Sequence, residues 1–92
     1  MDKELRKKVE ERLCDYAEAH KASRVVFKDP KATVGQRSNG LTELSMIHMA
    51  VIGYITAIMH ILGEEQAEFW YEYYLQSRSD KGLGQEDKTN ET

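Results

Sequence analysis

The chain has 92 residues, of which 40% are hydrophobic and 32% charged, and its formal net charge at pH 7 is −3. This length provides one domain with a modest core, and the composition is that of a folded helical protein rather than a disordered chain. The negative charge excludes a general attraction to nucleic acid or anionic membranes, so binding to phosphates would need a local cluster of basic residues.

The single cysteine, Cys14, excludes an intrachain disulfide and a paired cysteine metal motif. The first residues run straight into charged helix formers, with no apolar segment of the kind that a signal peptide contains. We therefore expect an unprocessed, cytoplasmic protein without a cofactor.

The first predicted helix covers residues 2 to about 22. Its apolar residues recur every three or four positions, as they do at Leu5, Val9 and Leu13, and Asp2 is placed to cap it. Val25-Val26-Phe27 is rich in β-forming residues, and Asp29 precedes the only proline, so the pattern predicts a long loop over residues 23–40.

The second predicted helix covers residues 41–62 and is apolar around almost its whole circumference, with Ser38 or Asn39 as its cap. At 100° per residue, one narrow stripe of this helix collects small and weakly polar side chains and is flanked by Ala50 and Ala57. The stripe consists of Thr42, Ser45, Met49, Gly53, Thr56 and His60.

The apolar surface of this helix must be shielded from water. The segment 46–62 has no permanent charge over 17 residues, the short end of what crosses a bilayer, but it contains His48 and His60 and is flanked by acidic residues. We therefore expect an all-α small helical bundle completed by homo-oligomerisation, with Gly53 and Ala57 at the interface, rather than a membrane span. Close packing of the stripe within one chain is the alternative.

The third predicted helix covers residues 64–77, restarts after Gly63, and is rich in aromatic and acidic residues. Trp70, Tyr71 and Tyr74 share a face that either docks on a partner protein or fills the domain's own core. Docking would make the protein a small phage-type interaction inhibitor or adaptor. Residues 79–92 are polar and predict a disordered tail after a single domain, 1–78.

Catalytic and metal-binding residues form no convincing set. His48 and His60 lie 12 residues apart on one helix, roughly 18 Å along its axis, too far to share a metal. His60, Glu64 and Glu68 could meet a metal only if the helix continued through Gly63. We expect neither an enzyme nor a metal site.

Positive charge is concentrated between residues 21 and 40. This segment contains five basic residues and one acidic residue, which gives it a local net charge of +4. Free amides and the positive dipole end at the start of a helix favour an anion there, particularly phosphate. The candidate ligand-binding residues are Arg24, Lys28, Lys31, Arg37, Ser38 and Thr42. The alternative is a solvated basic loop that pairs with the acidic helix 64–72 of its own or a neighbouring chain.

The run Ser38-Asn39-Gly40-Leu41-Thr42-Glu43-Leu44 resembles the Ser-x-x-Leu-Thr-x-Leu stretch of phage proteins that sponge cyclic-nucleotide immune signals, the anti-CBASS and anti-Thoeris sponges. Gly35 stands where that family has an arginine, and Arg37 adjoins the serine. The resemblance implies a non-catalytic host–virus anti-defence protein that sequesters a cyclic or linear nucleotide, with Ser38 and Thr42 contacting the ligand.

Overall fold

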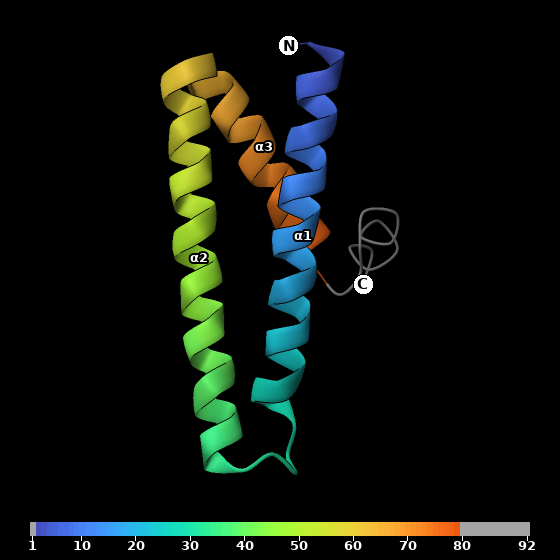
Figure 1. Cartoon of the computed structure of the whole chain (residues 1–92), viewed down its shortest axis with the longest axis vertical. Coiled ribbons are helices and arrows are strands. Elements are labelled where there is room, and N and C mark those ends of the chain that lie inside the picture. Colours follow the sequence, from blue (N-terminus) through green and yellow to red (C-terminus); the bar gives the residue numbers. More distant parts are fainter. Residues whose placement is uncertain (1, 80–92) are drawn as a thin grey trace, which may run out of the picture.

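The computed structural model describes residues 2–79, and within them every regular element is a helix: α1 (Lys3–Lys28), α2 (Val34–Leu62) and α3 (Glu64–Ser77). Helices α1 and α2 run antiparallel as a long hairpin, and α3 folds back from the end of α2 against both of them (Figure 1). The all-helical class is confirmed. The predicted tail lies outside the described residues apart from Ser79.

Helix α1 is longer than the predicted 2–22, because it continues through Val25-Val26-Phe27 to Lys28. The prediction was wrong because packing overrides the β preference of this stretch: Ser23 is buried, and Gly40 of α2 lies against the backbone of Ser23 and Phe27. The residue before Pro30 does end the helix, since Asp29 has an extended backbone with φ −68° and ψ 119°.

The predicted loop over residues 23–40 is also wrong, because only residues 29–33 connect α1 to α2. Helix α2 is capped by Thr33 and not by Ser38 or Asn39. Gln36 N donates to Thr33 Oγ1 at 3.1 Å, and Thr33 N donates to Gln36 Oε1 at 2.9 Å. This reciprocal capping box satisfies two backbone N–H groups and starts α2 seven residues before the predicted Leu41.

Gly63 separates α2 from α3, as predicted, and the third helix has the predicted bounds. The backbone φ of Gly63 is +103°, a value that residues with a side chain rarely adopt, so a glycine is required at this corner. The reversal places the aromatic residues of α3 against the hairpin.

The core lies where the three helices meet. Its largest fully buried side chains are Trp70 and Tyr74 from α3, Leu13 from α1 and Val51 from α2. Trp70 Nε1 donates to Gln66 Oε1 at 3.2 Å, which satisfies the indole N–H in this apolar setting.

Helix α2 is apolar but mostly uncovered. It is long and apolar enough to cross a membrane, yet only 11% of its most apolar 18-residue window is buried inside the structure. Neighbouring helices cover a single side of it, through residues such as Val51 and Ile58. The rest of this helix faces outward.

Candidate functional site

The outward side of α2, here called the outer face, is the predicted stripe of Thr42, Ser45, Met49, Gly53, Thr56 and His60. All of these residues are exposed except Thr56, which is half-buried. Met49 within the stripe is 70% exposed, and two apolar residues that border the stripe are also exposed, Met46 by 64% and Ile52 by 43%. The structure therefore turns the stripe away from the domain's own core.

The two glycines in the body of α2 differ in their surroundings. A Cβ at Gly40 would lie 3.1 Å from the backbone oxygen of Ser23 and 3.3 Å from the backbone nitrogen of Phe27, so Gly40 allows α1 and α2 to approach closely. A Cβ at Gly53 would meet nothing within 4 Å. Since glycine inside a helix costs about 0.5–1 kcal/mol relative to alanine, nothing in this chain's own packing explains Gly53. Ala57, the second predicted interface residue, is also exposed.

The basic tip, defined as Lys28, Lys31 and Arg37, surrounds the short loop between α1 and α2. All three residues are exposed, and the Arg37 guanidinium donates to the backbone oxygen of Asp29 at 3.0 Å. The side chain of Asp29 accepts from the backbone N–H of Lys31 at 2.9 Å, which orders the turn. Two lysines are thus held at the free end of the hairpin.

The other predicted ligand-binding residues lie apart from the tip. Ser38 and Thr42 are inside α2 and point outward, one and two turns from its start, rather than in a loop. Arg24 lies toward α3, where its guanidinium donates to the backbone oxygen of Arg78 at 3.3 Å. The six residues therefore do not gather in one pocket.

The aromatic residues of α3 face the core. Trp70 is 1% exposed and Tyr74 is 2% exposed, while Tyr71 is half-buried. Of the two interpretations left open by the sequence, this burial favours core filling, because a buried ring offers no surface to a partner. Phe69, which sequence reasoning did not select, is the aromatic side chain of α3 that remains half exposed.

The opposite side of α3 carries only negative charge. Glu64, Glu65, Glu68 and Glu72 are all exposed, and α3 contains no lysine or arginine. This acidic helix begins at the end of α2 farthest from the basic tip (Figure 1). The basic tip and the first residues of α3 are therefore separated by the length of α2.

The described residues contain no group of three or more His, Cys, Asp and Glu side chains able to hold a metal ion. The break at Gly63 separates His60 from Glu64, so the four-residue spacing of these residues does not continue along one helix. Cys14 Sγ lies 3.4 Å from the Tyr73 hydroxyl, and this hydrogen bond, together with burial, raises the pKa of Tyr73 to about 12. The pair joins α1 to α3.

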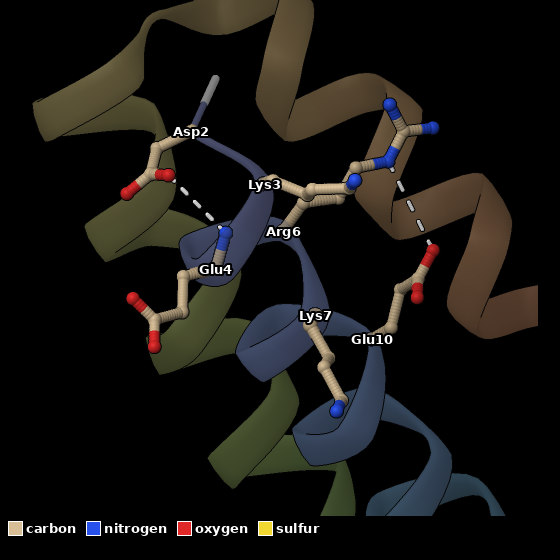
Figure 2. A pocket seen from close by; sticks show the side chains of 6 residues that line it. All are labelled: Asp2, Lys3, Glu4, Arg6, Lys7 and Glu10. Carbon is tan, nitrogen blue, oxygen red and sulfur yellow. Dashed lines mark hydrogen bonds and ion pairs between the residues drawn. The ribbon is translucent and has the colours of Figure 1, made fainter.

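A surface hollow lies at the start of α1. Figure 2 shows its lining side chains spreading outward in different directions from the first turns of the helix. Asp2 caps the helix by accepting from Glu4 N at 3.2 Å, and Arg6 Nε lies 3.9 Å from Glu10 Oε2. These contacts are the ordinary ones of a solvated helix end, so we assign no ligand to this hollow.

No family model, no curated protein and no solved structure matches this chain. The resemblance of Ser38–Leu44 to the phage sponges stays a prediction, and the structure moves its residues from the expected start of a helix into the body of α2. Functional inference therefore rests on the outer face of α2 and on the two charged regions.

Proposed function

We propose that this protein is a non-catalytic helical module that works by associating with itself through the outer face of α2. The observation that carries this proposal is the exposure of an apolar helix face centred on Gly53, a glycine that nothing in its own chain requires. Self-association would bury that face and add to a core that is small for a domain of this size.

The same face would suit hydrocarbon, but the rest of the fold argues against a bilayer. Helix α1 runs alongside α2 and carries exposed charges along its length, among them Lys8, Glu11, Asp15 and Glu18. If α2 crossed a membrane in this fold, these charges would enter the hydrocarbon at a high cost in free energy. A second protein surface covers α2 without that cost.

Sedimentation equilibrium on the full chain tests this proposal, with Met49→Glu as the disrupting variant. We expect the wild type to form an oligomer, and Met49→Glu to weaken its association at least tenfold, since an unpaired charge would be buried. Ala19→Glu is the control, because Ala19 is also exposed but lies on α1 and outside the basic segment 21–40. A wild type that stays monomeric at high concentration would overturn the proposal.

A second candidate function is binding of a phosphate-bearing ligand, as in a nucleotide sponge, at the basic tip. It is supported by two exposed lysines beside the Thr33-capped start of α2, where positive charge and the helix dipole act together. The ligand set is then Lys28, Lys31 and Arg37, which surround the loop. Ser38 adjoins Arg37 in the body of α2, and Thr42 lies a further turn along the helix.

Thermal unfolding in the presence of linear and cyclic nucleotides tests this candidate. A ligand that binds the folded state raises the melting temperature, by an amount that corresponds to about 2.7 kcal/mol at a hundredfold excess over Kd. We expect Lys31→Ala to remove this shift and Lys3→Ala, an exposed lysine at the other end of the hairpin, to keep it. No shift at millimolar nucleotide would exclude this function.

A further inference from the structure

The two ends of the outer face of α2 differ, because the two ends of the molecule carry opposite charge. The segment 21–40, at the tip of the hairpin, has a net charge of +4. Helix α3, which starts at the other end of α2, has a net charge of −4. The first ten residues of α1, Lys3–Arg12, lie near α3 and have a net charge of +2, so these two segments together keep a net charge of −2 at this end of the molecule.

The basic tip cannot neutralise the acidic start of α3 within one chain, whereas Arg24 of the same segment reaches the other end of α3. Helix α2 has 29 residues, so its ends are about 43 Å apart at the usual rise per residue. Charges separated by more than about 8 Å are largely screened at physiological ionic strength. A partner for the tip at the start of an α3 helix, near Glu64 and Glu65, must therefore belong to another molecule.

We propose that the occupant of the outer face is a second copy of the chain, packed antiparallel across a two-fold axis between Met49 and Gly53. This inference rests on the proposed self-association and adds its geometry. An antiparallel arrangement brings each basic tip to the partner's α3, whereas a parallel arrangement places like charges side by side. The complementary ends thus select one of the two orientations.

The register follows from the fit of large and small residues. With the axis between Met49 and Gly53, the exposed thioether of Met49 lies over the partner's Gly53, and the reverse contact follows from the symmetry. Thr42 then lies level with the partner's His60, and Arg37 lies about one helical turn beyond the C-terminal end of the partner's α2. The open space around Gly53 is filled by a flexible side chain suited to irregular gaps.

The basic tip then has carboxylates of the second copy as its partners. A phosphate-bearing ligand would compete with them, so inorganic phosphate at constant ionic strength should weaken the dimer if both sites use the same lysines. Sedimentation in phosphate and in chloride of equal ionic strength separates this competition from general screening.

Cross-linking measures the orientation. In a Cys14→Ser background, which removes the only native cysteine, Thr42→Cys and His60→Cys chains are mixed and treated with a short bifunctional maleimide. We expect the mixture to form a linked heterodimer. Thr42→Cys alone should not link to itself, because the two copies of that residue are about 27 Å apart in an antiparallel pair.

Charge reversal tests the contacts between the ends. We expect Lys31→Glu and Glu65→Lys each to weaken the dimer, about two- to thirtyfold in Kd at low salt for two symmetry-related pairs. The double variant in one chain should recover the affinity, since it exchanges the charges of two ends that face each other only between copies. Lys3→Glu is the control for a change in net charge.

The outcomes separate this inference from the proposed function. Self-linking of Thr42→Cys, or no recovery in the double variant, would overturn the antiparallel arrangement and leave self-association standing. A wild-type chain that is monomeric, or that floats with vesicles of neutral lipid instead of dimerising, would overturn both.

Discussion

At the scale of single residues, some residues of this protein have a clear role in folding, whereas others have none within the chain. Gly40, Gly63, Trp70 and Tyr74 each have a structural reason within the chain: a close helix approach, a positive φ, or burial in the core. Gly53 and Met49 have none, since both are exposed on α2. Residues of the second kind are where a function of this protein is to be sought.

Alanine substitutions at the two α2 glycines should have opposite effects on folding. We expect Gly53→Ala to raise the free energy of unfolding by about 0.5–1 kcal/mol, because it gains helix propensity and meets nothing. Gly40→Ala should lower it, because crowding against two backbone atoms of α1 costs about 1–3 kcal/mol.

Urea unfolding of both variants in the Met49→Glu background measures this, since that background separates folding from association. A loss of stability in Gly53→Ala would show that Gly53 is packed within its own chain, contrary to the structure.

Tyr73 gives a pH dependence with a defined sign. Its pKa is raised to about 12, first by the hydrogen bond with Cys14 and then by burial, while unfolded tyrosine titrates near 10.0. The folded state therefore keeps this proton to higher pH, so its contribution is complete below pH 10 and is lost as pH rises toward 12. Burial also raises the pKa of Tyr54 and Tyr74, which act in the same direction.

We expect Tyr73→Phe and Cys14→Ala each to make the decline of stability between pH 10 and 12 shallower. Urea midpoints measured across this range provide the test. A Tyr73→Phe profile identical to that of the wild type would show that the tyrosine does not hold its proton through this contact.

At the scale of elements, the end of α1 and the start of α2 show where local patterns mislead. The proline, the glycines and the β-rich Val25-Val26-Phe27 favoured a long loop, but Thr33 and Gln36 form a capping box three residues apart. That motif was visible in the sequence and would have placed the start of α2 correctly. The continuation of α1 to Lys28 had no such local signal, because it depends on contact with α2 around Gly40.

The observed cap of α2, Thr33, and a predicted cap, Ser38, can be compared directly. We expect Thr33→Ala to lower the free energy of unfolding by about 1 kcal/mol, because it removes the acceptor of the Gln36 N–H. Ser38→Ala should have no such cost, because Ser38 lies inside α2, where alanine is the better helix former. Chemical unfolding of both variants decides between the observed and the predicted start of the helix, and a costly Ser38→Ala would favour the predicted one.

At the scale of the whole molecule, the fold is a hairpin braced at one end by α3, with one helix face left over. The hairpin separates the basic tip from the start of the acidic helix by the length of α2, so a chain with a small net charge carries opposite charges at its two ends. An uncovered apolar face between opposite charges favours pairing with an inverted copy. Polarity and apolar exposure together carry more of the functional argument than any single side chain.

The sequence by itself determined the helical class, the break at Gly63, the bounds of α3 and the set of residues that share the α2 stripe, because periodicity and local backbone preferences encode these features. Only the tertiary structure decided that the stripe faces outward, that Trp70 and Tyr74 face inward, and that α1 continues to Lys28. The tertiary structure also decided that the candidate ligand-binding residues do not lie together in one pocket. Local sequence records which residues share a face, whereas contacts between residues far apart in the chain decide which faces meet.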